Sequence, residues 1–103
     1  MAEFHDGMPP IHPGEVLREE YLAPLSMTPN ALATALHVTP NRINDIVLER
    51  RGITPDTAVR LARYFQCEPE FWLNMQSLYD LTLAEAAADE ALRSIEPITL
   101  PAA

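Results

Sequence analysis

A short polar segment between positions 39 and 51 carries the side chains best suited to chemistry. Amide, carboxylate and guanidinium groups follow one another closely there, in Thr39, Asn41, Arg42, Asn44, Asp45, Arg50 and Arg51. Asparagine can pair with adenine through two hydrogen bonds, arginine can pair with guanine, and aspartate can accept a hydrogen bond from cytosine. The segment therefore has the donors and acceptors needed to read the edges of DNA bases.

Both ends of this segment also suit phosphate groups. Thr39 and Asn41 lie at an expected helix start, where the helix dipole and the free backbone N–H groups favour an anion. Arg50 and Arg51 follow in the next loop, where they could clamp phosphates and set the register of the protein on a duplex. The segment thus combines base-reading side chains with groups that hold the DNA backbone.

The charge of the chain is distributed unevenly. The 103 residues have a formal net charge of −8, and all seven cationic side chains are arginine. Five of these arginines lie between positions 42 and 63 with only three acidic residues, so this window is positive while the rest of the chain is strongly acidic. Such arginines could be merely solvated, but the pattern allows one local anion-binding surface and disfavours unselective binding to polyanions.

The elements that must position these side chains are predicted to be helices. Thr-Pro occurs at positions 28–29, 39–40 and 54–55, and each pair suits a helix start. Threonine can accept a hydrogen bond from the first turn, and proline fits the first helical position. His12-Pro13 and Glu68-Pro69 mark two further starts, and apolar residues at helical spacing follow each one. We therefore expect an all-α domain of five helices.

The second and third predicted helices are separated only by His37, Val38 and Thr39. A turn of about three to four residues between short helices is typical of a helix-turn-helix, whose second helix enters the major groove of DNA. His37 is expected at positive φ, Val38 between the two helices, and Ala33 where they approach closely. No histidine or cysteine lies at ligand spacing from His37, so we expect no metal and no cofactor.

The region from about residue 12 to residue 81 closely resembles the HigA family of antitoxins, within the phage-repressor-like helix-turn-helix class. The motifs that carry the resemblance are "HPGEVLREEYLAPL", "RINDIV", "RRGIT", "AVRLARYF" and "EPEFWLNMQ", in this order. Two positions depart from the pattern. Pro29 replaces a glutamine that contacts DNA in many repressor-like relatives, and Leu48-Glu49 replaces a frequent Arg-Gly, which removes a cation and a helix-ending glycine.

The resemblance implies a five-helix phage-repressor-like helix-turn-helix domain that forms a homodimer. Family members bind double-stranded operator DNA with an inverted repeat, repress their own operon and neutralise a HigB-like toxin, a small basic RelE-type RNase that cleaves messenger RNA. The resemblance also implies DNA contacts. These fall on Thr39, Asn41, Arg42 and Asn44, with Arg50 and Arg51 on the backbone. A stand-alone regulator without a toxin, and a toxin-binding module with little DNA affinity, are the alternatives.

The fifth helix has more apolar surface than a small helical core needs. Phe71 and Trp72 are expected in the core. A dimer interface is expected farther along the helix, because clusters of leucine and aromatic residues on small domains commonly mark one. Its predicted residues are Leu78, Tyr79, Leu81 and Leu83. Acidic residues outside the arginine window either solubilise the helices or complement a basic toxin.

The ends of the chain are predicted to lie outside the domain. Residues 1–11 are expected to form a flexible N-terminal arm, residues 12–92 the DNA-binding domain with its dimerisation helix, and residues 93–103 a tail. The "ITL" sequence of that tail could pair as a short C-terminal strand, if need be with a partner chain.

Several classes of protein are disfavoured. No apolar run approaches about eighteen residues, so no membrane span is expected, and the N-terminus lacks the features of a secretion signal. The single cysteine, Cys67, excludes an intramolecular disulfide, as is usual in the reducing cytoplasm. The three histidines have no partnered nucleophile or base, and no glycine-rich phosphate loop is present, so an enzyme is not expected.

Overall fold

The structure is a computed structural model that describes residues 9–102, and it is helical as predicted. Its helical segments are α1 Pro13–Val16, η2 Leu17–Leu22, α2 Ala23–Leu25, α3 Pro29–Leu36, α4 Pro40–Val47, α5 Pro55–Phe65, α6 Pro69–Ala87 and α7 Asp89–Arg93. The first three are continuous and form the first predicted helix, with η2 as a π-helical stretch in its middle. Most of the predicted N-terminal arm, residues 1–8, lies outside the described residues.

All five predicted helix starts are confirmed, each with proline in the first turn. The Thr28 hydroxyl accepts a hydrogen bond from Ala31 N at 3.1 Å, and the Thr54 hydroxyl accepts one from Thr57 N at 3.5 Å. The cap of α1 is a histidine instead, because His12 Nδ1 accepts from the Gly14 N–H at 2.8 Å. Side-chain caps of this kind stabilise a helix by about 1 kcal/mol.

Four helices end in the same way, on a residue other than glycine in the left-handed conformation. Ser26, His37, Glu49 and Gln66 have φ values between 52° and 63°. After each of them, the next backbone N–H bonds to the carbonyl five residues earlier, which satisfies an otherwise unpaired group of the helix end. This conformation costs an ordinary residue roughly 1–2 kcal/mol. The predicted positive φ of His37 is thereby confirmed.

The core lies where the first helix, α3, α4, α5 and the beginning of α6 meet. Its largest fully buried side chains are Trp72, Leu17, Leu32, Ile43, Ile46 and Leu61. The first helix crosses α4 at Gly14, where an added Cβ would lie 1.8 Å from the carbonyl oxygen of Ile46. Glycine is therefore required at this crossing because no side chain fits between the two backbones.

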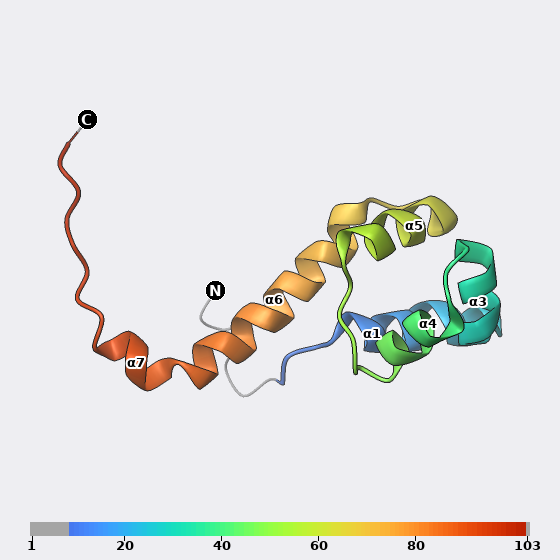
Figure 1. Cartoon of the computed structure of the whole chain (residues 1–103), viewed down its shortest axis with the longest axis horizontal. Coiled ribbons are helices and arrows are strands. Elements are labelled where there is room, and N and C mark those ends of the chain that lie inside the picture. The colour runs from blue at the N-terminus through green and yellow to red at the C-terminus, as the bar shows by residue number, and fades with distance from the viewer. Residues whose placement is uncertain (1–8, 103) are drawn as a thin grey trace.

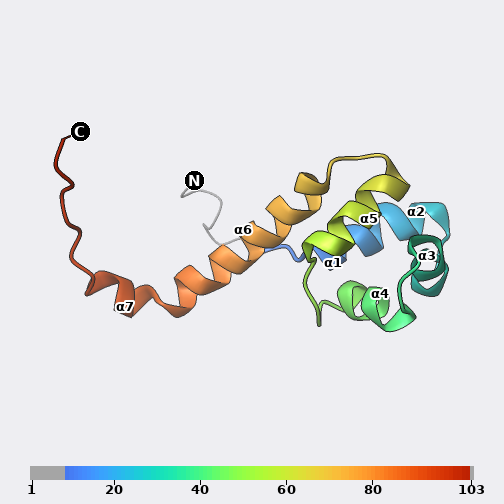
Figure 2. The ribbon, with the colours of Figure 1, turned by 45° about the horizontal axis from the view of Figure 1, so that its top comes forward.

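The helix α6 leaves this body and runs outwards, with α7 and the tail at its far end (Figure 1, Figure 2). It ends at Ala87, and α7 follows after a break at Ala88, where the backbone departs from helical geometry. Residues 95–102 form no strand in this single chain, so the predicted short C-terminal strand is not formed there. No helix within residues 9–102 is long and apolar enough to cross a membrane.

Candidate nucleic-acid interface

The helix-turn-helix consists of α3, the turn from His37 to Thr39, and α4. Ala33 is fully buried where the two helices approach, and the half-buried Val38 packs against the core, as predicted. Ile43, Ile46 and Val47 fix α4 on the body. The opposite face of α4 therefore carries the polar residues outwards.

The start of α4 presents free hydrogen-bonding groups. Thr39 is the residue before the helix, but its side chain makes no capping hydrogen bond, unlike Thr28 and Thr54. Thr39 and Asn41 are both exposed. The Thr39 hydroxyl and the Asn41 side-chain amide can therefore meet a ligand together at the start of α4, and the helix dipole favours an anionic one.

Arg42 is not a freely extended side chain. Its Nη1 donates to Asp56 Oδ2 at the start of α5 and lies 3.5 Å from the Thr57 hydroxyl. The same Asp56 oxygen accepts from Arg60 Nε at 3.0 Å, and Arg60 Nη1 donates to the Leu36 carbonyl at 2.8 Å. These bonds from Arg42 and Arg60 lower the pKa of the Asp56 carboxyl, so it is a carboxylate at neutral pH.

Asn44 is held between the two helices of the motif. Its Nδ2 donates to Asn30 Oδ1 on α3 at 2.8 Å and to the Pro40 carbonyl at 2.9 Å. The amide of Asn30 is therefore placed beside the polar face of α4. Asn30 is absent from the sequence-based prediction, because its proximity to Asn44 depends on how α3 packs on α4.

The two loop arginines share one carboxylate. Arg50 Nη2 lies 3.5 Å from Asp45, and Arg51 Nη2 lies 3.4 Å from the same side chain. Both arginines remain exposed, and pairs of this kind contribute little stability in water. Asp45 thus gathers the two cations beside the C-terminal part of α4, where the sequence predicts phosphate contacts.

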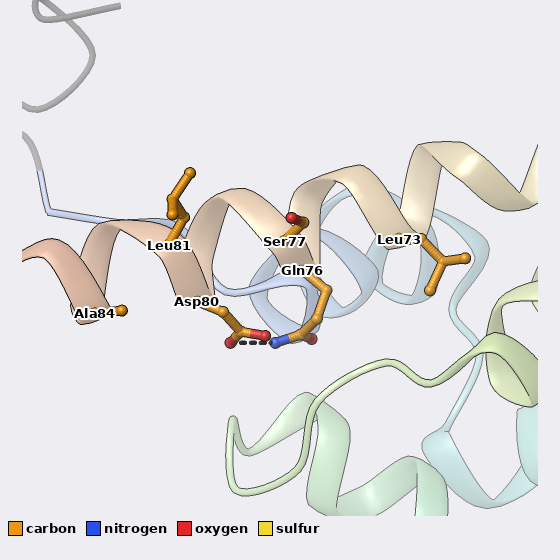
Figure 3. Close-up of a pocket in the computed structure, with 6 residues that line it drawn as sticks. All are labelled: Leu73, Gln76, Ser77, Asp80, Leu81 and Ala84. Atoms are coloured by element: carbon orange, nitrogen blue, oxygen red, sulfur yellow. Dashed lines mark hydrogen bonds between the residues drawn. The ribbon is translucent and has the colours of Figure 1, made fainter. Parts of the chain in front are cut away.

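The far end of this arginine loop is attached to α6 by Gln76. Gln76 Oε1 accepts from the Ile53 N–H at 2.7 Å, and its Nε2 donates to Asp80 Oδ1 at 2.9 Å. Figure 3 shows Gln76 and Asp80 turned toward one another on one face of α6, along a shallow groove. Gly52 lies close to the Gln76 amide, because a Cβ added at Gly52 would be 2.8 Å from Gln76 Cδ. Gln76 is a further residue that sequence reasoning missed.

The C-terminal end of α4 is held by the first helix. Arg18 Nη1 donates to the Val47 carbonyl, and Arg18 Nη2 lies 3.4 Å from Glu49. Glu49 adopts positive φ at the position where the family frequently has glycine. The departure at Leu48-Glu49 therefore keeps the helix end but places one additional carboxylate beside the arginine loop.

The predicted dimerisation residues separate into two groups on α6. Leu78, Leu81 and Leu83 are exposed apolar side chains. Tyr79 is half-buried, and its ring packs against His12 within the same chain. Three of the four predicted residues are thus exposed on the projecting part of α6, where Leu78 and Leu81 share one face of the helix and Leu83 lies on another.

Comparisons with known proteins agree with this geometry. Residues 17–72 match the model of the helix-turn-helix family. Virulence-associated protein I of Dichelobacter nodosus is 64% identical over 78 residues, which is 76% of this chain and 72% of that protein. Antitoxin HigA-1 of Vibrio cholerae is 33% identical over 89 residues, which is 86% of this chain and 84% of that protein. The chain belongs to the HigA family of helix-turn-helix antitoxins.

A solved HigA structure has the same fold. The antitoxin HigA of Pseudomonas aeruginosa, determined with the higBA promoter, is 49% identical in sequence and superposes with a TM-score of 0.84. The match covers 87% of this chain and 99% of that one, so it includes α6 as well as the helix-turn-helix. The HigA membership predicted from the sequence motifs is confirmed.

Proposed function

We propose that this HigA protein is a homodimeric antitoxin that binds an inverted-repeat operator, represses its own operon and neutralises a HigB-like toxin. The observation that carries the proposal is the polar face of α4, which follows a three-residue turn and is flanked by exposed arginines. Operator binding requires the protein to share the cytoplasm with bacterial DNA, so we place it there.

The α4 face supports a specific division of DNA contacts. Arg42 suits the edge of guanine, with Asp45 beside it, because arginine forms a bidentate pair with that base. Asn44 donates both amide hydrogens within the chain, so the group it can offer to a base is its Oδ1 acceptor. Thr39 and Asn41 at the helix start suit phosphate. Arg50 and Arg51 are exposed beside Asp45, a position that suits contacts with the backbone of the duplex.

The projecting helix supports a dimer. Leu78 and Leu81 expose one apolar face of α6 that association with a second copy would remove from water, and Leu83 is exposed on another face of the same helix. A two-fold dimer would set its two α4 helices about 34 Å apart, which is one turn of DNA. The acidic surface away from the arginine window favours association with a basic toxin by charge complementarity.

DNA binding is tested with the purified full chain and fluorescent duplexes. We expect the DNA upstream of its own gene to bind much more tightly than a scrambled duplex of equal length. The affinity should fall steeply between low and moderate salt, because phosphate contacts release counterions. Equal affinity for both duplexes, or an affinity that is independent of salt, would remove the repressor function.

Toxin neutralisation is tested by expressing the small basic reading frame that we expect beside this gene. Its product should arrest growth when expressed alone, and co-expression of this chain should restore growth and yield a co-purifying complex. If the product of the neighbouring reading frame is harmless and does not bind this chain, the protein is instead a stand-alone regulator. A complex without operator binding would leave a toxin-binding module.

A further inference from the structure

Resting on the proposed function, we infer that Asp56 is a positioning residue that determines the base specificity of Arg42. Asp56 lies outside the helix-turn-helix, in the first turn of α5. Its carboxylate nevertheless contacts the base-reading helix directly, through the Arg42 guanidinium. The chain thus uses a residue of the next helix to aim a side chain of the recognition helix.

The geometry leaves the useful edge of the guanidinium free. Nη1 of Arg42 is engaged by Asp56 and the nearby Thr57 hydroxyl. Within residues 9–102, neither Nε nor Nη2 has a hydrogen-bond partner. These two groups point from the same edge of the guanidinium, and an edge with two parallel donors matches the O6 and N7 acceptors of guanine.

Asp56 is itself held in place. Its Oδ2 accepts from Arg60 Nε at 3.0 Å, and Arg60 Nη1 donates to the carbonyls of Leu36 at 2.8 Å and His37 at 3.4 Å. The chain of contacts therefore runs from the turn of the motif through Arg60 and Asp56 to Arg42. A free arginine loses many rotamers when it binds, and a guanidinium that is already oriented loses fewer.

The carboxylate should also suppress binding to the wrong DNA. Asp56 is more than half exposed, beside the arginine that faces the duplex. Its negative charge weakens the general attraction of this face for phosphate, whereas an oriented Arg42 gains its full bonds only on guanine. Asp56 is thus expected to increase the ratio of operator affinity to random-DNA affinity in two ways, by raising the first and lowering the second.

The test compares Asp56→Ala with a matched control, Asp89→Ala. Both residues lie in the first turn of a helix and pair with an arginine four residues later, and each replacement removes one negative charge. Affinities are measured for the operator, for a random duplex and for operators with one guanine changed. We expect Asp56→Ala to lower the operator-to-random ratio by about tenfold, with unchanged or tighter binding to random DNA. Asp89→Ala should keep the ratio.

Three further measurements make the outcome decisive. The lost preference should map to one base pair in each half-site, Asp56→Asn should act in the same direction as Asp56→Ala, and Asp56→Glu should restore part of the ratio. In an Arg42→Ala background, Asp56→Ala should leave the ratio unchanged, because the two residues act as one unit. Thermal unfolding monitors whether each variant folds, and Asp56→Asn serves if the alanine variant does not.

Two results would overturn the inference. One is an equal change of affinity for operator and random DNA in Asp56→Ala. The other is a further loss of specificity when Arg42 is already alanine. Failure of the wild-type chain to prefer the operator is a different result, seen before any variant is tested, and it contradicts the proposed function itself.

Discussion

The ring of Tyr79 stands edge-on to the imidazole of His12, with their centroids 4.8 Å apart at an interplanar angle of 74°. This contact joins the middle of α6 to the first turn of the domain. His12 is only 4% exposed, and its Nδ1 accepts the hydrogen bond that begins α1. The folded structure therefore requires the neutral form of the imidazole at the point where α6 leaves the body, because a protonated Nδ1 cannot accept this hydrogen bond.

Stability is expected to depend on pH through His12. Burial lowers the pKa of this imidazole, although Glu49 and Asp80 act in the opposite direction. The unfolded chain, with a histidine pKa of about 6.5, then binds a proton before the folded chain does. The free energy of unfolding should fall as pH decreases below about 6.5, and urea unfolding followed by Trp72 fluorescence at pH 7.5 and 5.5 measures it.

The control for this pH effect is His12→Asn, which can still accept a hydrogen bond at the cap. The variant should be less stable at neutral pH, and its unfolding free energy should change less between the two pH values. An identical pH dependence in wild type and variant would exclude His12 as the titrating group.

The two glycines at close backbone approaches should respond differently to alanine. Gly14→Ala forces a Cβ against the Ile46 carbonyl, a backbone atom that cannot move aside, and is expected to cost roughly 1–3 kcal/mol or more. Gly52→Ala meets only the Gln76 side chain, which can turn away, so its cost should be clearly smaller. Thermal unfolding of both variants measures the difference, and equal losses would contradict this account of the α1–α4 crossing.

Replacing Glu49 with glycine should stabilise the chain. The substitution removes the cost of positive φ at this residue, offset by the greater freedom of glycine in the unfolded chain and by the loss of a half-exposed contact with Arg18. We expect a net gain of about 0.5–1 kcal/mol. Ser26→Gly, at another left-handed helix end, is the comparison, and a loss of stability in both would argue against strain at these positions.

DNA affinity should separate the base-reading arginine from the loop arginines. Arg42→Ala is expected to cost roughly 1–3 kcal/mol on the operator and to relax sequence preference. Arg51→Ala should weaken binding to all sequences alike and reduce the salt dependence of binding by about one counterion. Titrations of both variants on operator and random DNA measure this, and equal losses on both duplexes for both variants would refute the assigned roles.

The helices of this protein can largely be predicted from its sequence because the signals that start and end them are local. The prolines after Thr28, Thr39 and Thr54 fix where helices begin, and the short turn around His37 fixes the motif. Two features near the end of the chain are harder to predict from the sequence. The break at Ala88 lies within a run of alanines that gives no sign of it, and a strand needs a partner that the sequence alone does not supply.

The side-chain pairs of the interface could not be predicted, because they depend on packing between helices. The sequence predicts Arg42 as a base contact from its place in the third predicted helix, but its bond to Asp56 requires the approach of α4 to α5. The same is true of Asn44, whose partner lies on α3. Tyr79 is similar, since the sequence places it with exposed leucines and the structure places it on His12.

The hydrogen bond from the Ile53 N–H to Gln76 links α6 directly to the end of the arginine loop. A partner that tilts α6 would pull on Ile53, two residues beyond Arg51, without disturbing α3 or α4. We therefore expect a partner bound to α6 to change the contacts of the arginine loop with the DNA backbone, while the base contacts stay the same. Gln76→Ala should disconnect the two, so that a partner on α6 no longer alters the salt dependence of DNA binding.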